Sequence, residues 1–218
     1  MKKQLTFYFI RHGRTVWNEQ GLMQGSGDSP LTEEGIQSAV KTGKALQNVN
    51  FIAAYSSCLQ RTIDTANYII GDRDIPLFQH RGLNEHYFGS WEGTNVERIR
   101  PLPEFQQMIN DPANYKAESN GGETYEQLAK RAIAALQDII KVHQEGNILV
   151  VSHGHTLRLL IALLNGATWQ NHRDKDKSVS LLNTAISIIH YDNEKGFSLE
   201  KLNDTTHLQY IKKKPLNH

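Results

Sequence analysis

Hydrophobic residues along this chain fall into short dense runs and into longer stretches with helical spacing. Residues 5–10 are apolar except for Thr6. Residues 147–152 form a nearly unbroken apolar run, which is typical of a buried parallel strand. Further strands are predicted at residues 51–55, 74–78, 184–191 and 197–202.

The longer stretches have the periodicity of amphipathic helices. Thr32 precedes Glu33 and Glu34, and this order is suited to cap the start of a helix. A helix over residues 61–70 is expected to stop at Gly71. The remaining predicted helices cover residues 125–143 and 157–164.

This alternation of strands and helices predicts an α/β fold with three layers, in which helices flank a mostly parallel central sheet. No repeat, low-complexity tract or linker divides the chain, so residues 1–218 are expected to form a single domain. The pattern breaks down over residues 94–122, where three prolines interrupt a polar and aromatic stretch. We expect this segment to be a small lid-like excursion, with Phe105, Met108 and Tyr115 helping to roof a pocket.

Composition narrows the class of protein. Lys and Arg number 24 against 23 Asp and Glu, so the formal net charge is +1. This near-balance offers no electrostatic reason to expect nucleic acid or an anionic membrane as a partner. No apolar run approaches the length of a membrane span or has the form of a signal peptide, and we therefore expect a cytoplasmic protein. Cys58 is the single cysteine, which excludes an intrachain disulfide and a Cys-based zinc site.

Candidate chemistry begins at Arg11-His12-Gly13, directly after the first predicted strand. Ligands of α/β sheets bind beyond the carboxyl ends of strands, so His12 is expected at the edge of an active site. The triplet alone is weak evidence, because a histidine after a strand is usually a turn or surface residue. Further features follow in order, namely Arg14-Thr15-x-x-Asn18, Gln24-Gly25, Asp28-Ser-Pro-Leu-Thr32-x-x-Gly35, Ser56-Ser57-x-x-x-Arg61-Thr62, Leu83-Asn84-Glu85-x-x-Phe88-Gly89-x-Trp91 and Val151-Ser152-His153-Gly154-His155.

Taken together, these features resemble the histidine phosphatase superfamily, also called phosphoglycerate-mutase-like, over roughly residues 5–210. The joint match is highly specific, although Gln24-Gly25 alone would not be. The resemblance implies a phosphate pocket and a proton donor, Glu85. The phosphate pocket that it implies consists of Arg11, His12, Arg61 and His153.

The same residue types suit phosphoryl transfer on chemical grounds. A phosphomonoester is a dianion, and the planar guanidinium groups of Arg11 and Arg61 suit its oxygens. His12 must be neutral to attack phosphorus, which nearby cations and burial both favour, and it would form a phosphohistidine intermediate. His153 is expected to donate a hydrogen bond to an equatorial oxygen. Glu85 is expected to protonate the leaving alkoxide and then to activate water. Nothing in this set calls for a metal or an organic cofactor.

A second group of residues is predicted to bind substrate. Asn18 and the backbone at Gly13 would complete the phosphate cradle. Two interpretations of His155 stay open, as a substrate contact and as a surface residue. A metal pair formed with His153 is disfavoured, because no third ligand has suitable spacing. The predicted substrate-binding residues are Gly13, Asn18, Gln24, Gly25, Tyr87, Gly154 and His155, with Trp17 and Met23 expected to line the same pocket.

Three functions fit this site: a phosphatase of small phosphorylated metabolites, a 2,3-bisphosphoglycerate-dependent phosphoglycerate mutase, and a non-catalytic phosphate-binding protein. Residues 96–120 lack the Arg-Tyr-Lys and paired arginines of the family's glycolytic mutases, which favours the phosphatase. The non-catalytic interpretation is disfavoured because His12 and Glu85 are both present. The substrate and the oligomeric state, including a homodimer, stay open, and residues 212–214 are predicted to be a solvated tail.

Overall fold

One sheet with the strand order β3-β2-β4-β1-β5-β6 forms the centre of the molecule. In the computed structural model, which describes residues 1–213, β1 to β4 are parallel, β5 is antiparallel to β1, and β6 is antiparallel to β5. The predicted mostly parallel sheet is thereby confirmed. The strands are β1 (Gln4–Arg11), β2 (Phe51–Ser56), β3 (Leu77–Gln79), β4 (Glu145–Ser152), β5 (Ile186–Asp192) and β6 (Gly196–Asp204).

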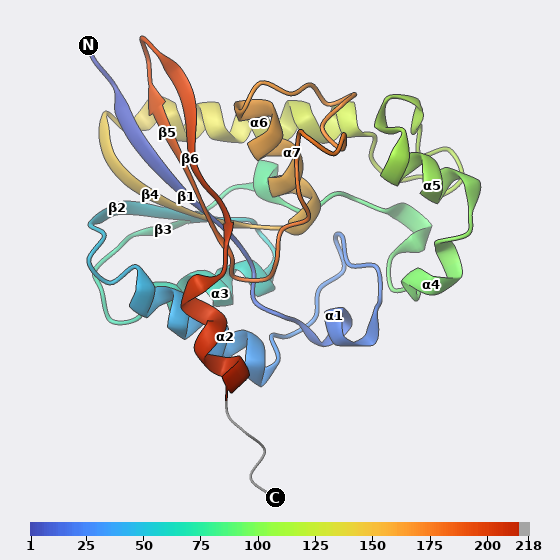
Figure 1. The fold of residues 1–218 in the computed structure, drawn as a ribbon, viewed down its shortest axis with the longest axis horizontal. Coiled ribbons are helices and arrows are strands. Elements are labelled where there is room, and N and C mark those ends of the chain that lie inside the picture. Colours follow the sequence, from blue (N-terminus) through green and yellow to red (C-terminus); the bar gives the residue numbers. More distant parts are fainter. Residues whose placement is uncertain (214–218) are drawn as a thin grey trace, which may run out of the picture.

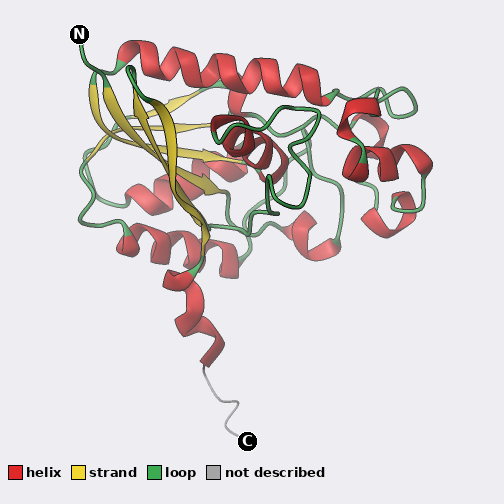
Figure 2. Cartoon of the chain, turned by 45° about the horizontal axis from the view of Figure 1, so that its top comes forward, coloured by secondary structure: helices red, strands yellow, loops and turns green. Residues whose placement is uncertain are grey.

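Helices cover both faces of the sheet, which gives the three predicted layers (Figures 1 and 2). Because side chains alternate across a strand, Phe7 and Phe9 face one hydrophobic cluster and Ile10 faces the other. The first cluster includes Leu136 and Leu157 from the helices α6 and α7, and the second includes residues of α2 and α3. These helices are α2 (Glu33–Ala45), α3 (Gln60–Ile70), α6 (Tyr125–Val142) and α7 (Gly154–Leu164).

Side chains at the helix ends explain where the main helices begin. Thr32 accepts a hydrogen bond of 3.1 Å from the amide of Gly35 and caps α2, as predicted. Thr124 and Gln127 form a reciprocal capping box that starts α6. Gly71 follows the last residue of α3, where the sequence predicts its end. The short elements are α1 (Val16–Gln20), α4 (Val96–Ile99), α5 (Pro103–Asn110), η1 (Arg81–Leu83), η2 (Gly89–Trp91), η3 (Pro112–Asn114) and η4 (Thr206–Lys213).

Two predicted strands start later than expected. The strand predicted at residues 74–78 corresponds to β3, which begins at Leu77. It starts late because the amide of Ile75 donates to the carbonyl of Arg73 in a turn, and Pro76 has no N–H to donate to a strand ladder. The strand predicted from Thr184 begins at Ile186, because Thr184 has a φ of 57°, outside the extended region.

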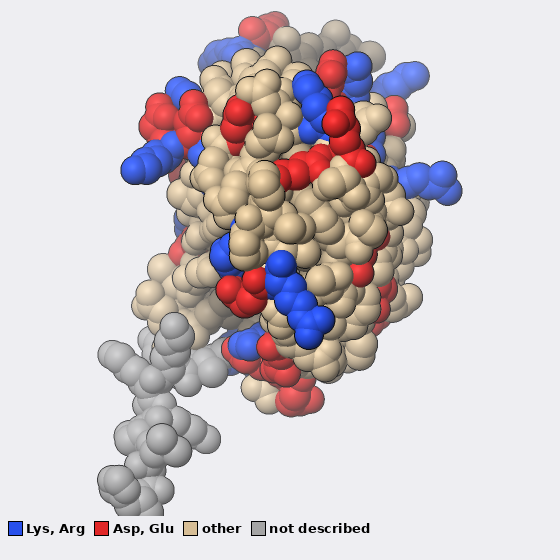
Figure 3. Space-filling model, turned by 90° about the vertical axis from the view of Figure 1, so that its right-hand side faces the viewer, with Lys and Arg blue, Asp and Glu red and all other residues tan. Residues whose placement is uncertain are grey.

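Residues 94–122 contain α4, α5 and η3, and their apolar side chains point inward. Phe105, Met108 and Tyr115 are at most 3% exposed and pack with Tyr125 and Leu128 of α6. The predicted excursion is therefore a packed extension beside the sheet, to the right in Figure 1. Figure 3 shows the side of the molecule that carries this extension, where acidic and basic side chains are interspersed among uncharged ones.

Among the described residues, no helix combines the length and the apolar character needed to cross a membrane. The predicted tail at residues 212–214 lies outside the residues whose side chains the structure describes.

Candidate active site

Most of the predicted catalytic residues meet at the carboxyl edge of the sheet. Arg11 is the last residue of β1 and pairs with Ser152, the last residue of β4. His12 and His153 follow directly, and the amide of His12 donates to the carbonyl of Ser152 at 3.0 Å. Arg61 reaches the same place from the first turn of α3, after β2. Parallel strands therefore bring together residues that lie up to 142 positions apart, from Arg11 to His153.

His12 is held in one orientation and one tautomer. Its side chain is buried, and its Nδ1 lies 2.7 Å from the carbonyl oxygen of Gly13. A carbonyl can only accept, so Nδ1 carries the proton and donates it. The other ring nitrogen, Nε2, then keeps its lone pair, and His12 lines the cavity described below. An imidazole in this state is a competent nucleophile.

The surroundings of His12 keep it uncharged. Burial, followed by the guanidinium groups of Arg61 and Arg11, holds the pKa of His12 well below its usual value of 6.5, against an opposing contribution from the Gly13 hydrogen bond. His12 is therefore neutral at physiological pH and needs no base to release its lone pair.

The two arginines are fixed by backbone oxygens and keep a free donor each. Arg11 donates from Nη1 to the carbonyl of Leu181 at 2.7 Å. Arg61 donates to the carbonyls of Gly25 and Gly27 and forms an ion pair of 3.0 Å with Asp28. The Nε atoms of both arginines are buried without a partner among the described residues. Unpaired buried donors of this kind are costly, and an anion bound beside His12 would satisfy them.

His153 supplies a third buried donor. Its Nε2 lies 2.8 Å from the hydroxyl of Ser57, whereas its Nδ1 is buried without a partner in the described part of the chain. Its ring centroid lies 5.3 Å from that of His12. Burial and then Arg61 lower the pKa of His153 well below 6.5, so its ring is neutral beside His12.

Glu85 is held by the start of α7. Its Oε1 accepts from the amide and the hydroxyl of Thr156, at 3.0 and 3.1 Å, and from the amide of His86 at 2.9 Å. Its Oε2 accepts from the amide of His155 at 3.2 Å. The carboxyl group is largely buried and lines the same cavity as His12. Its position suits proton exchange with a group bound at His12.

Arg131 on α6 fixes the loop that carries Glu85, and the sequence does not reveal this role. It donates to the carbonyls of Gly82, Asn84 and Glu85 at distances of 2.8–3.0 Å. It also forms a bidentate ion pair with Glu123 at 2.7 and 2.8 Å. The only sequence signal was the Gly121-Gly122-Glu123-Thr124 run before α6. In the sequence, Arg131 has the spacing of an ordinary helix residue.

A cavity of about 230 Å³ is lined by Arg11, His12 and Glu85, whereas Arg61 and His153 are not among its lining residues. Of the predicted substrate-binding residues, Asn18, Gln24, Gly154 and His155 line it. Gln24 Nε2 and His155 Nδ1 are buried and have no partner among the described residues. The full lining is Arg11, His12, Asn18, Leu22, Met23, Gln24, Glu85, Phe88, Gly154, His155, Arg158, Arg173, Ser180 and Leu181.

Three other predicted substrate contacts lie elsewhere. The amide of Gly13 donates to Thr65 at 2.9 Å, so it supports the His12 loop and is not free for phosphate. Gly25 lies behind the site, where its carbonyl holds Arg61 and a Cβ would come within 2.5 Å of Glu92 and of the His86 carbonyl. The Tyr87 side chain is 43% exposed and does not line the cavity.

The expected roof also differs from the observed one. Met23 lines the cavity as predicted, but Trp17 does not. Residues 94–122 contribute nothing to its lining, because their apolar side chains are used in the cluster against α6. The segment that follows α7 contributes Arg173, Ser180 and Leu181 instead.

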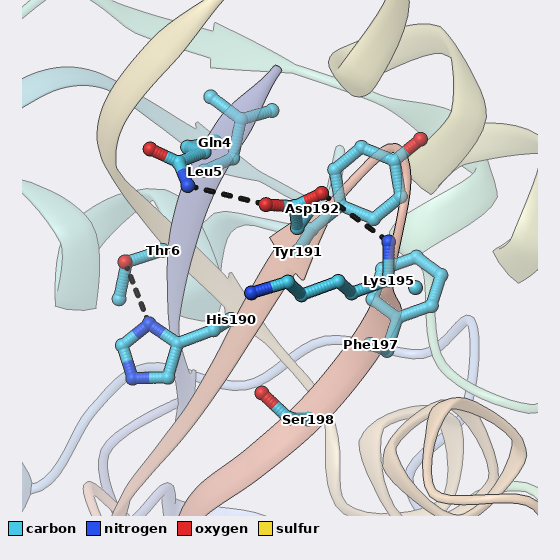
Figure 4. A pocket seen from close by; sticks show the side chains of 10 residues that line it. Gln4, Leu5, Thr6, His190, Tyr191, Asp192, Lys195, Phe197 and Ser198 are labelled. Carbon is cyan, nitrogen blue, oxygen red and sulfur yellow. Dashed lines mark hydrogen bonds between the residues drawn. The ribbon is translucent and has the colours of Figure 1, made fainter. Parts of the chain in front are cut away.

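A larger cavity of about 460 Å³ lies at the opposite end of the sheet, between the start of β1 and the β5–β6 hairpin (Figure 4). Four of its polar side chains form two hydrogen-bonded pairs. Thr6 bonds His190 at 2.9 Å, and Gln4 donates to Asp192 at 3.1 Å. The unpaired buried donors therefore single out the smaller cavity as the reactive one. Within the described residues, no group of three or more His, Cys, Asp and Glu side chains is arranged to hold a metal ion.

Comparison with known proteins agrees with this geometry. A family model described as the histidine phosphatase superfamily (branch 1) matches residues 7–205. A metal-independent phosphoserine phosphatase from Arabidopsis thaliana is 31% identical over 205 residues, covering 93% of this chain and 82% of the relative. A 2,3-bisphosphoglycerate-dependent phosphoglycerate mutase from Bartonella quintana (strain Toulouse) is 33% identical over 168 residues, covering 74% and 82%.

Solved structures show the same fold. YhfR from Bacillus stearothermophilus matches with a TM-score of 0.86 and 33% identity, covering 94% of this chain and 99% of that one. A phosphoserine phosphatase from Entamoeba histolytica, in complex with 3-phosphoglyceric acid, matches with a TM-score of 0.81 and 29% identity, covering 94% and 99%. These likenesses confirm the predicted fold class.

Proposed function

The chain belongs to branch 1 of the histidine phosphatase superfamily, and on that basis we propose that it hydrolyses phosphomonoesters of small metabolites through a phosphohistidine on His12. One observation carries the proposal. The Nδ1–H of His12 is bound to the Gly13 carbonyl, which leaves Nε2 as a lone pair in a cavity beside two arginines with unpaired Nε donors.

In the first step, Nε2 of His12 attacks phosphorus and the P–O bond to the alcohol breaks. Charge develops on the equatorial oxygens, and the unpaired donors of Arg11, Arg61 and His153 support its stabilisation. The leaving alkoxide takes a proton from the Glu85 carboxyl group. The products of this step are the free alcohol and phosphohistidine.

In the second step, water attacks the phosphohistidine. Glu85, now ionised, accepts a proton from that water, and the P–N bond breaks to release inorganic phosphate and neutral His12. The hydrogen bonds from Thr156 and from the α7 amides support this role, because they hold the carboxyl group in one position through both steps.

The size of the cavity favours a small substrate. Its volume of about 230 Å³ is below the range of roughly 300–1,000 Å³ typical of drug-sized ligands. One curated relative is a phosphoserine phosphatase, and one solved relative was crystallised with 3-phosphoglyceric acid. We infer that the partner of this site is a phosphorylated metabolite of similar size.

Mutase activity is the second candidate, because a phosphoglycerate mutase is 33% identical over 74% of this chain. The two functions share the first step and differ in whether water or the bound alcohol takes the phosphoryl group. Coverage of the chain does not separate the two, because a probable phosphoglycerate mutase from Yersinia pestis matches over 94% of it and the phosphoserine phosphatase over 93%. Hydrolysis is favoured by residues 96–120, which lack the Arg-Tyr-Lys and paired arginines of the family's glycolytic mutases.

The test is release of inorganic phosphate from a panel of phosphometabolites, with and without 2,3-bisphosphoglycerate. We expect phosphate release without the bisphosphate, and an acid-labile phosphoenzyme in rapid-quench samples. The His12→Ala variant should show neither. Isomerisation of phosphoglycerate without phosphate release would establish the mutase instead, and loss of activity in EDTA would contradict a metal-free mechanism.

A further inference from the structure

Two further arginines line the active-site cavity, and both come later in the sequence than Arg11 and Arg61. Arg158 lies on α7, one turn after His155, and Arg173 lies in the segment that follows the helix. Both line the same cavity as His12 and Glu85. The proposed hydrolysis of a simple phosphomonoester assigns them no task.

Their hydrogen-bond partners are uncharged. Arg158 donates from Nε to the hydroxyl of Ser178 at 2.8 Å and from Nη1 to that of Ser180 at 3.1 Å. Arg173 donates from Nε to the hydroxyl of Tyr125 at 3.0 Å. In the described part of the chain, neither guanidinium forms an ion pair with a carboxylate. Each is oriented by neutral groups and keeps nitrogen donors free.

The two charges are close enough to disfavour each other. Burial and the neighbouring Arg173 lower the pKa of Arg158 to about 10, so Arg158 is still a cation at neutral pH. Burial lowers the pKa of His155 well below 6.5, and Arg173 and Arg158 are among the further causes. Two partly desolvated cations on one wall of a cavity are stabilised most by an anion between them.

Two other polar groups of the cavity also lack a hydrogen-bond partner among the described residues. Gln24 Nε2 and His155 Nδ1 line it and are buried without a partner among the described residues. Met23, Phe88 and Leu181 supply apolar surface. A small cavity in which polar groups stand beside a few apolar side chains can recognise a ligand at more than one point.

We propose that Arg158 and Arg173 bind a second anionic group of the substrate, a carboxylate or a further phosphate, while Arg11 and Arg61 bind the phosphoryl group that is transferred. This inference rests on the proposed function and defines its substrate class as small phosphomonoesters that carry another negative charge. Guanidinium groups suit both anions, because their planar donors match two oxygens at once.

The test uses pairs of substrates that differ in the second charge. 3-Phosphoglycerate and glycerol 3-phosphate differ only by a carboxylate in place of a hydroxymethyl group. Fructose 1,6-bisphosphate and fructose 6-phosphate differ by a second phosphate. We expect the charged member of at least one pair to have a kcat/KM about 10- to 100-fold higher, in line with hydrogen bonds to a charged group. The pair that shows the preference identifies the anion.

The double variant Arg158→Met and Arg173→Met should bring the ratio of the two kcat/KM values within that pair close to one. It should do so mainly by lowering kcat/KM for the charged member. Arg98→Met is the matched control, because Arg98 is exposed on α4 and does not line the cavity. It should leave both kcat/KM values unchanged. Circular dichroism and thermal unfolding check that each variant is folded.

Failure of this inference differs from failure of the proposed function. Equal kcat/KM values within both pairs for the wild type, or equal losses for both members in the double variant, would overturn the second-anion site. No phosphate release from any compound would overturn the hydrolase. Calorimetric titration of the His12→Ala variant tests the second site without turnover. It should bind the charged member about 10-fold more tightly, and equal affinities would reject the site.

Discussion

His12 and His153 are both buried neutral imidazoles, and their hydrogen-bond partners give them different chemical capacities. His12 faces a carbonyl, which can only accept, so its Nε2 is left as a nucleophile. His153 faces the Ser57 hydroxyl, which can also donate, so its Nδ1 can keep a proton for a bound oxygen. In the proposed mechanism, the role of each histidine follows from the atom that it hydrogen-bonds.

Glu85 gives a prediction at the same scale. The Glu85→Gln variant should lower kcat for alkyl phosphates about 10²- to 10⁴-fold, because a basic alkoxide cannot leave without a proton. It should lower kcat for p-nitrophenyl phosphate far less, because that leaving group is stable as an anion. The measurement is the ratio of kcat for the two substrates. Glu118→Gln, at an exposed position, is the control, and equal losses on both substrates would refute the acid role.

Among the elements, α6 contributes to the active site without lining it. Arg131, in the second turn of this helix, binds three carbonyls of the loop that ends at Glu85, and Glu123 orients its guanidinium. The loop has no regular ladder of its own after η1, so these bonds hold Glu85 against the start of α7. Arg131 thus positions Glu85, the proposed proton donor.

The Arg131→Met variant should lower kcat for alkyl phosphates about 10-fold, in line with the loss of charge-assisted hydrogen bonds, with KM little changed. The loss on p-nitrophenyl phosphate should be smaller, as for Glu85→Gln, since the defect lies in proton delivery. Arg131→Lys, which keeps one charge and fewer donors, should recover part of the rate. Lys130→Met, at an exposed neighbouring position, is the control. A purely structural role would lower both activities equally and follow the thermal stability.

Across the whole molecule, several histidines are kept neutral by burial, and they make the free energy of unfolding depend on pH. Burial is the largest cause in each case, and it lowers the pKa of His86 and of His172 to about 4. The other buried histidines with a pKa well below 6.5 are His12, His153 and His155. In the unfolded chain these side chains return to their ordinary pKa and take up protons first as the pH falls.

The free energy of unfolding should therefore decrease as the pH is lowered from about 6.5 towards 4. Each such histidine contributes up to about 1.4 kcal/mol per pH unit within that window. Urea titrations at pH 7, 6 and 5, in buffers without phosphate so that the active site is not occupied, measure the slope. Equal stability at pH 7 and pH 5 would show that these histidines are not held neutral.

Sequence patterns predicted the architecture well, because strand and helix periodicities are local. The four long helices, the sheet and the cap at Thr32 follow from neighbours within a few residues. The errors come from non-local causes. Residues 94–122 were expected over the pocket, but the apolar face of α6 offered Phe105 and Met108 a place to be buried. No local pattern distinguishes those two outcomes.

The sequence by itself determined which chemistry is present: two histidines, two arginines and a carboxylate of the types that phosphoryl transfer needs. Only the tertiary structure decided what these groups can do. It set His153 against Ser57, used Arg131 to hold the Glu85 loop, and brought Arg158 and Arg173 to the same cavity as His12. These contacts join residues that are far apart in the chain, and only folding brings them together.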